Sequence, residues 1–281
     1  MNIVGTIAEM RALCRSAKSG GKRLGLVPTM GALHEGHLSL VRAAKEKTDV
    51  IATSIFVNPT QFGPTEDFSR YPRALEKDCA ILWREGVEFV FAPAVEEMYP
   101  AGAVTWVTVG GLSDRLCGKS RPGHFRGVAT VVAKLFHIIE PDAAFFGQKD
   151  AAQHAIIRKM VRDLDMPVAI EVCPIVREAD GLALSSRNTY LNTEERKSAL
   201  VLYRSLQCAQ ELFRTGERNS AKLIAAARQE FASESNVRLD YFKIVNPDSL
   251  EHVLDTSSPS LAAVAAYVGN TRLIDNIVLG A

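Results

Sequence analysis

The sequence predicts an α/β protein, with a doubly wound parallel sheet in one domain and a smaller α+β domain after it. Two observations lead to this fold class. Short apolar runs alternate with amphipathic helical patterns over the first part of the chain, and this alternation stops after Val176. Strand–helix alternation is typical of parallel sheets that carry helices on both faces. The polar, glycine-bearing stretch 174–188 is the expected boundary, giving domains of residues 1–175 and 176–281.

Each expected element rests on the spacing of its apolar residues. In the first domain, the predicted strands are residues 24–27, 50–57, 89–91, 143–146 and 168–172. The helical patterns between them are residues 7–17, 38–47, 74–84, 128–139 and 151–164. In the second domain, helices are expected at 193–213 and 221–231, followed by strands at 239–245, 261–268 and 273–279.

Composition and charge limit the class of protein. The chain has 281 residues and 47% hydrophobic content, enough to fill the cores of one large or two ordinary domains. Its net charge of +1, from 33 basic and 32 acidic residues, predicts no broad attraction to nucleic acid or to an anionic membrane. Glu9 and Arg11 interrupt the region where a signal peptide needs its apolar core, so we expect a cytoplasmic protein. The five cysteines lack C-x-x-C spacing and are expected to be buried free thiols.

The segment 27–38, VPTMGALHEGHL, is the most informative stretch of the chain. It joins an apolar strand to a helical pattern through a turn with two glycines and two histidines. The first N–H groups of a helix have no partner within it and carry partial positive charge, which favours phosphate. Imidazoles three residues apart share a helix face and can donate to phosphate oxygens. We therefore expect His34 and His37 to bind a nucleotide.

Other motifs fit this stretch less well. A zinc protease needs H-E-x-x-H, and the histidines here are one residue too close, so metal binding is the weaker alternative. The sequence contains neither a P-loop nor G-x-G-x-x-G, since Ser19-Gly20-Gly21-Lys22 lacks the upstream glycine of a P-loop. An ATP site must then use the histidine turn.

Several blocks together resemble one enzyme family. The strand, turn and helix with His-x-Gly-His resemble the ATP signature of nucleotidylyl transferases and class I aminoacyl-tRNA synthetases, although the balanced charge disfavours a tRNA substrate. Five blocks are similar, in the same order, to motifs of the pantoate:β-alanine ligase family. They are 28–34 (PTMGALH), 56–62 (FVNPTQF), 121–128 (RPGHFRGV), 145–150 (FFGQKD) and 177–188 (READGLALSSRN). The resemblance covers about residues 24–191, and the remainder agrees only in length and general pattern.

This resemblance implies a Rossmann-like fold and the ATP-dependent condensation of pantoate with β-alanine, in pantothenate biosynthesis and on the route to coenzyme A. A carboxylate reacts poorly with an amine because its leaving group would be oxide, so the acid must be activated. In this family activation gives pantoyl adenylate, and AMP and pyrophosphate are released. The resemblance also implies Mg²⁺ carried with ATP and a homodimer; no metal site on the protein is expected. Residues 176–281 would form a lid over the active site.

The family motifs assign roles to individual residues. Fixed donors that stabilise charge are expected at His34, His37, Lys149, Ser185, Ser186 and Arg187, and His37 matches the family's catalytic histidine. ATP contacts are expected from Met30, Gly31, Ala32, Leu33, His34, Glu35, Gly36, His37, Gly147, Gln148, Lys149, Asp150, Val176, Leu184, Ser185, Ser186 and Arg187. Gln61 and Gln153 match the pantoate-binding glutamines. A helix cap is the alternative role for Asp150 and for the Ser185 segment.

Some features depart from the family pattern or leave other functions open. Leu184 stands where methionine is common, and Gln148 stands where glutamate is common. Leucine can still cover an adenine face, and Gln148 could act through its backbone. Two other functions stay open from the residues: a nucleotidylyltransferase acting on another small acid or a phosphorylated acceptor, and a module that binds ATP without turnover.

Overall fold

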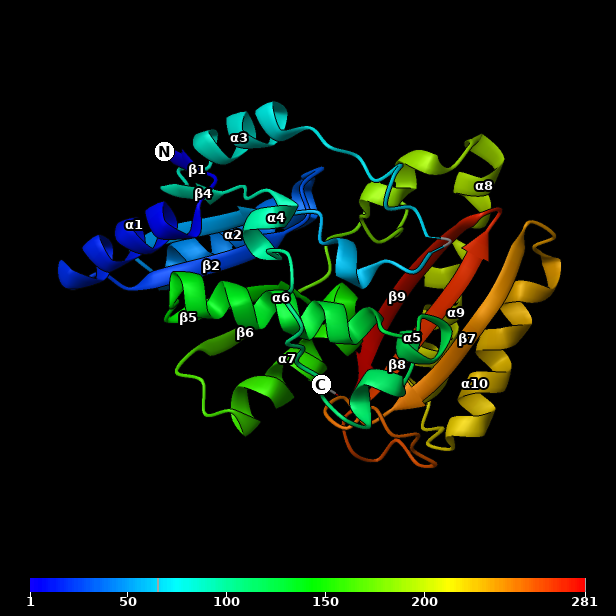
Figure 1. Ribbon diagram of the computed structural model, residues 1–281. Coiled ribbons are helices and arrows are strands. Elements are labelled where there is room, and N and C mark those ends of the chain that lie inside the picture. The colour runs from blue at the N-terminus through cyan, green and yellow to red at the C-terminus, as the bar shows by residue number, and fades with distance from the viewer. Residues whose placement is uncertain (65, 281) are drawn as a thin grey trace. The chain divides into compact units, whose positions relative to one another are not determined.

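The computed structural model describes residues 1–64 and 66–280 and divides into two compact units (Figure 1). The first unit consists of Met1–Asp114, Gly118–Gly147 and Ile156–Pro174, and the second of Arg115–Cys117, Gln148–Ala155 and Ile175–Ala281. The sequence predicted a single boundary between residues 175 and 176. The structure instead groups two short segments of the predicted first domain with the second unit. Such grouping depends on long-range contacts, which apolar spacing does not reveal.

The first unit contains a six-stranded parallel sheet, which confirms the predicted fold class. Its strands are β1 (Asn2–Val4), β2 (Leu24–Thr29), β3 (Val50–Ile55), β4 (Phe89–Phe91), β5 (Ala143–Gly147) and β6 (Ala169–Cys173). Their spatial order is β1-β4-β3-β2-β5-β6, and every neighbouring pair is parallel. Strand order therefore reverses between β2 and β5, the place where ligands bind in doubly wound sheets.

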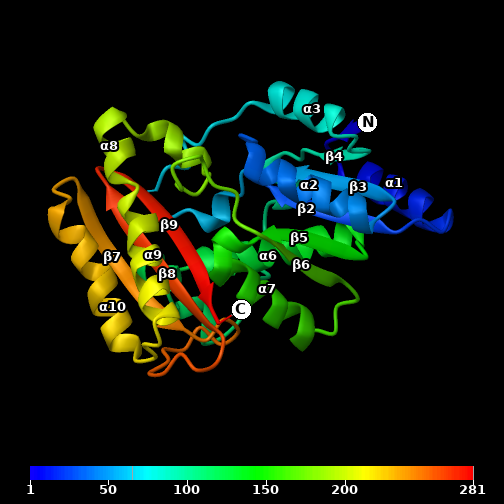
Figure 2. The same ribbon diagram turned by 180° about the vertical axis from the view of Figure 1, so that it is seen from behind.

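Helices cover both sides of this sheet (Figures 1 and 2). They are α1 (Ile7–Ser19), α2 (Glu35–Lys47), α3 (Leu75–Arg84), α4 (Val95–Met98), α6 (His124–Ile139) and the later part of α7 (Ala151–Asp163). Three short helices, η1 (Pro59–Gln61), η2 (Leu112–Asp114) and α5 (Cys117–Ser120), lie between these elements along the chain. Val41 and Leu82, from α2 and α3, pack in one core with Val27 and Phe145 of the sheet. Among the helices of the described residues, none is long and apolar enough to span a membrane.

The second unit has a three-stranded antiparallel sheet and a helical layer, in agreement with the predicted α+β domain. The order is β7 (Val237–Val245), β8 (Ser260–Val268) and β9 (Thr271–Leu279). The helices are α8 (Thr193–Ser198), α9 (Val201–Arg214) and α10 (Ser220–Gln229), with η3 (Gln148–Asp150), η4 (Ser186–Tyr190) and η5 (Glu230–Ser233). Leu206 of α9 and Leu223 of α10 share a core with Phe242 and Val264, so both helices pack on one face of the sheet (Figure 2).

Several element predictions differ from the structure in detail; helix α6, for example, begins at His124 instead of residue 128. The expected helix 193–213 is two helices, because the N–H groups of Leu200 and Leu202 bond three residues back instead of four and tighten the chain between α8 and α9. Strand β1 was missed because three residues are too short to show a period. Helix α2 begins at Glu35 instead of residue 38, because His34 caps it.

Candidate active site

A buried carboxylate supports the histidine turn between β2 and α2. Gly31 and Ala32 both have positive φ, 79° and 51°, and a Cβ at Gly31 would approach the Asp78 carboxylate to 3.0 Å. Asp78 lies in α3 with 1% of its surface exposed, and it accepts the N–H groups of Ala32 at 2.8 Å and Leu33 at 2.9 Å. It thus sets the backbone of the predicted ATP turn. Asp78 was not among the predicted residues, because in the sequence it looks like any polar position of an amphipathic helix.

The two histidines of the turn cap α2 with their own side chains. His34 is the N-cap, and its Nδ1 accepts the Gly36 N–H at 3.1 Å; the Nδ1 of His37 accepts the His34 N–H at 3.3 Å. The ring centroids are 4.1 Å apart. Because Nδ1 is an acceptor in both rings, the neutral imidazoles carry their proton on Nε2, which is a donor. We expected the first N–H groups of the helix to be available to a phosphate. This is wrong for Gly36, whose N–H donates to the His34 ring.

Gln61 is held in the same unit by Asn58 and Met30. The Asn58 side chain is 1% exposed, and its Nδ2 donates to the Gln61 Oε1 at 3.1 Å and to the Gly127 carbonyl at 3.2 Å. The Gln61 Nε2 donates to the Met30 thioether at 3.1 Å. A Cβ at Gly127 would come within 2.3 Å of the Thr60 carbonyl, so this glycine lets α6 reach η1. The structure thus brings two predicted residues, Met30 and Gln61, into contact.

A chain of charged and polar groups contacts the backbone carbonyl of Gln61. Arg121 binds both carboxylate oxygens of Glu66 at 2.6 Å, and it donates to the Nε2 of His124 at 3.0 Å. Because an arginine only donates, His124 must accept at Nε2 and carry its proton on Nδ1, which donates to the Gln61 carbonyl at 2.8 Å. Burial tends to raise the pKa of Glu66, but the hydrogen bonds and charge of Arg121 lower it below its ordinary value. Arg121 and His124 of the 121–128 block thus hold the backbone of Gln61, which is predicted to bind pantoate.

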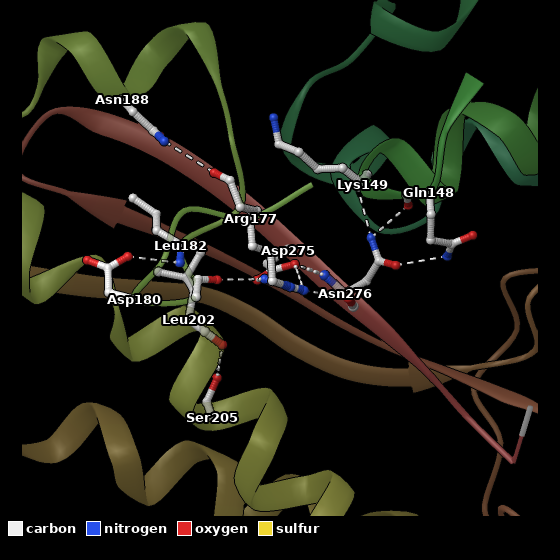
Figure 3. A network of polar contacts seen from close by, with 12 residues as sticks. Gln148, Lys149, Arg177, Asp180, Leu182, Asn188, Leu202, Ser205, Asp275 and Asn276 are labelled. Atoms are coloured by element: carbon white, nitrogen blue, oxygen red, sulfur yellow. Dashed lines mark hydrogen bonds and ion pairs between the residues drawn. The ribbon is translucent and has the colours of Figure 1, made fainter. Parts of the chain in front are cut away.

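The remaining predicted residues, apart from Gly147, belong to the second unit. Gln148, Lys149 and Asp150 form η3, directly after β5. Asn276 of β9 donates from Nδ2 to the carbonyls of Gln148 at 3.0 Å and Lys149 at 2.9 Å, and the Lys149 side chain extends away from it (Figure 3). Burial lowers the pKa of Lys149; the charge of Arg187 also lowers it, while the charge of Asp150 opposes the shift.

The segment that follows β6 forms a small hairpin. The Leu184 N–H donates to the Val176 carbonyl at 3.0 Å, and Arg177 pairs with Ala183 as an isolated antiparallel bridge. Two predicted ATP residues, Val176 and Leu184, are thus hydrogen-bonded to each other. Beyond them, the Ser185 hydroxyl accepts the Arg187 N–H at 3.3 Å and caps η4, which is the capping role that the sequence had left open.

The predicted residues therefore fall into two groups. Met30 to His37, Gln61 and Gly147 lie in the first unit, and Gln148, Lys149, Asp150, Gln153, Val176, Leu184, Ser185, Ser186 and Arg187 lie in the second. Gln153 is half-buried near the start of α7. Over residues 1–64 and 66–280, no group of three or more His, Cys, Asp or Glu side chains is arranged to hold a metal ion.

Comparison with known proteins decides the family. The family model described as Pantoate-beta-alanine ligase matches residues 2–278. The chain belongs to the pantoate-beta-alanine ligase family. It is 61% identical to the pantothenate synthetase of Acidobacterium capsulatum, over 98% of this chain and 96% of that protein. It is 58% identical to the pantothenate synthetase of Koribacter versatilis, over 100% and 97%.

Solved structures agree with this assignment. The crystal structure of pantothenate synthetase from Thermus thermophilus has a TM-score of 0.94 and 47% identity, covering 99% of both chains. The pantoate-beta-alanine ligase of Francisella tularensis, solved as a complex with beta-gamma ATP and beta-alanine, has a TM-score of 0.81 and 34% identity, covering 99% of this chain and 97% of that one. Membership of the pantoate-beta-alanine ligase family makes this protein an enzyme of the ligase class and selects that function over the two others the sequence left open.

Proposed function

We propose that the enzyme makes pantothenate from pantoate, β-alanine and ATP in two steps. A carboxylate oxygen of pantoate attacks the α-phosphorus of ATP, the bond to the bridging β-phosphate oxygen breaks, and pyrophosphate leaves. The amine of β-alanine then attacks the acyl carbon of pantoyl adenylate, loses a proton and displaces AMP. Negative charge builds on phosphate oxygens in the first step, so fixed donors in a protected site should supply most of the acceleration.

The geometry of the histidine turn is the observation that carries this proposal. Both Nδ1 atoms accept backbone N–H groups, so both Nε2 atoms are donors without any need for protonation. Their rings are anchored to the first turn of α2, where the helix dipole also favours an anion. We assign His34 and His37 to the triphosphate, with His37 donating where charge develops, and Met30 to His37 as the ATP turn.

The second unit supplies further donors for ATP. Lys149, Ser185, Ser186 and Arg187 offer an ammonium group, two hydroxyls and a guanidinium, the groups that bind phosphate oxygens. Asp150 would accept from the ribose hydroxyls. The other expected ATP contacts of this region, and the last residue of β5, complete the set: Gly147, Gln148, Val176 and Leu184. Residues 176–281 would act as a lid that brings Ser185, Ser186 and Arg187 to ATP.

Gln61 and Gln153 are proposed to bind pantoate. Support comes from the way Gln61 is fixed: its Oε1 is taken by Asn58, and its Nε2 has a second hydrogen to donate beyond the Met30 contact. That hydrogen suits a hydroxyl or carboxylate oxygen of the acid. Gln61 also lies, by the family match, near the β-alanine position.

The proposal includes a metal ion, an oligomeric state and a location. Mg²⁺ would enter with ATP, because it keeps several waters and typically binds through substrate phosphates. The homodimer follows from the family resemblance, and the cytoplasm is the location expected from the sequence. Light scattering of the purified protein tests the dimer, since a mass near 30.7 kDa would contradict it.

One assay tests the chemistry. The enzyme is incubated with ATP, Mg²⁺, pantoate and β-alanine, and AMP, ADP and pyrophosphate are followed with each substrate omitted in turn. We expect one AMP and one pyrophosphate per pantothenate, and pyrophosphate–ATP exchange with pantoate alone. ADP as the stoichiometric product would refute adenylation.

A further inference from the structure

Two adjacent residues of the C-terminal strand contact two predicted ATP segments of the second unit. Asp275 and Asn276 lie in β9, outside the five blocks that resemble the family motifs. Asp275 pairs across the sheet with Val264, which packs in the core with α9 and α10, and Asn276 pairs with Ala263. Successive side chains of a strand point to opposite faces, so this one strand reaches two different segments.

Asn276 holds η3 through its side-chain amide. Its Nδ2 donates to the main-chain carbonyls of Gln148 and Lys149, at 3.0 and 2.9 Å, and its Oδ1 accepts from the Gln148 Nε2 at 2.9 Å (Figure 3). Asn276 is 2% exposed, so these bonds do not compete with water. The backbone is thereby held on both sides of the Lys149 Cα.

Asp275 holds the base of the hairpin that leads to Ser185. It is 3% exposed, and its two oxygens accept from the Arg177 guanidinium at 2.6 and 2.9 Å. Arg177 also donates to the Gly181 carbonyl at 3.0 Å and lies over the Tyr203 ring, 4.3 Å from its centroid. A bidentate ion pair of this kind fixes direction as well as distance.

We propose that Asp275 and Asn276 are positioning residues for the adenylation step. From one strand, Asn276 fixes Lys149 through η3, and Asp275 fixes the Ser185–Arg187 segment through the 177–183 hairpin. This inference rests on the proposed function, because it matters for catalysis only if these donors bind ATP. The physical reason is that a donor helps a transition state only when it is already in place, and a shift of about 1 Å can cost up to about 10²-fold in rate.

The same geometry gives Gln148 a role. Glutamate is common at this position in the family, and a carboxylate cannot donate to the Asn276 Oδ1, whereas the Gln148 amide does so at 2.9 Å. Glutamine at position 148 therefore adds a side-chain hydrogen bond to the two carbonyl contacts of Asn276. The two carbonyl contacts do not depend on that side chain.

The test is a double-mutant cycle between Asn276→Ala and Lys149→Ala. Pyrophosphate–ATP exchange gives kcat and the KM values for ATP and pantoate, and urea unfolding reports stability. We expect Asn276→Ala to lower kcat about 10-fold with the KM for pantoate within about twofold. In the Lys149→Ala background the same change should cost less than about twofold, because the group it positions has gone. Asn236→Ala, the same substitution at an exposed position of the second unit, is the matched control and should keep the rate within about twofold.

The outcomes separate this inference from the proposed function. Equal fold-losses from Asn276→Ala in both backgrounds would show a general structural effect and overturn the positioning role. An unchanged rate in Lys149→Ala alone would instead refute the proposed role of Lys149. If Asn276→Ala does not fold, Asn276→Ser enters the same cycle, since a serine hydroxyl is too short to reach both carbonyls. Asp275→Asn with Arg187→Ala forms the corresponding cycle for the hairpin, and additive losses there would likewise overturn the proposal.

Discussion

Asp78 and Ala32 are joined by a 2.8 Å hydrogen bond in which a buried helix carboxylate fixes a residue with φ of 51°. A non-glycine residue in this conformation is uncommon and needs support from its surroundings. The second oxygen of the same carboxylate accepts the Leu33 N–H at 2.9 Å. The turn that presents the two histidines is therefore shaped by a residue of another helix.

We predict that Asp78→Asn destabilises this turn. The amide NH₂ would face one of the two N–H groups, leaving a buried donor without its acceptor at a cost of about 1–3 kcal/mol in unfolding free energy. The adenylation rate should fall about tenfold because the histidines lose their support. Urea unfolding and pyrophosphate exchange measure the two effects. Glu76→Gln, the same chemical change at an exposed site of α3, should alter neither; wild-type values for Asp78→Asn would mean that the turn holds its shape unaided.

We predict that His37→Ala lowers the adenylation rate by on the order of 10²-fold, as expected for losing one preorganised donor. His37→Gln should recover part of this loss, because the glutamine Nε2 can place an N–H where the imidazole Nε2–H was. Single-turnover formation of AMP measures both variants. Equal rates for wild type and alanine would make His37 a helix-capping residue only.

We predict that Asn58→Ala impairs use of pantoate more than use of ATP. Asn58 fixes the orientation of the Gln61 amide and also accepts from Thr60 and Tyr99, so its removal leaves several buried groups unsatisfied. The KM for pantoate should rise about tenfold and the unfolding free energy should fall by about 1–3 kcal/mol. Tyr99→Phe removes one donor from Asn58 but leaves the Gln61 bond, so it serves as the control. A rise confined to the KM for ATP would place Gln61 in the wrong pocket.

We predict that Lys149 controls the alkaline limit of activity. Its pKa is lowered by burial and by Arg187, so it loses its positive charge at a lower pH than an ordinary lysine. The kcat/KM for ATP should therefore decline with rising pH before an unperturbed lysine would titrate. Lys149→Arg stays charged throughout, and its profile should stay flat over that range even if its absolute rate is lower. An identical alkaline limb in both proteins would assign the titration to another group.

We predict that the Glu66–Arg121 pair stabilises the fold except at acid pH. The folded pKa of Glu66 lies below its value of 4.5 in the unfolded chain, so its contribution is fully present above pH 4.5 and is lost as the pH falls through the folded pKa. Glu66→Gln should therefore be less stable than wild type at neutral pH, with the difference shrinking in acid. Urea unfolding from about pH 3 to 7 checks this, and a constant difference over the whole range would show that the charge of Glu66 is not the cause.

The order of motifs along the chain predicted the fold class and the family because these depend on local patterns. Alternating strands and helices require a parallel sheet, and His34, Gly36 and His37 directly after a strand indicate a phosphate-binding turn. Family resemblance, in turn, supplied roles for Gln61 and Gln153 that spacing alone could not. The spacing of apolar residues placed the start of α2 three residues late, because it does not show that the histidine rings cap the helix.

Tertiary structure decided which residues support the site. Asp78 reaches the histidine turn from α3, and Asn58 orients Gln61. Asp275 and Asn276 reach the Arg177 and Lys149 segments across more than 90 positions of the chain. Nothing in the sequence near these residues marks them, because a carboxylate or amide is identified as a positioning group only by what it contacts. Composition and periodicity determine how a chain folds locally, whereas the partners of its buried polar groups depend on which distant segments the folded chain brings within hydrogen-bonding distance.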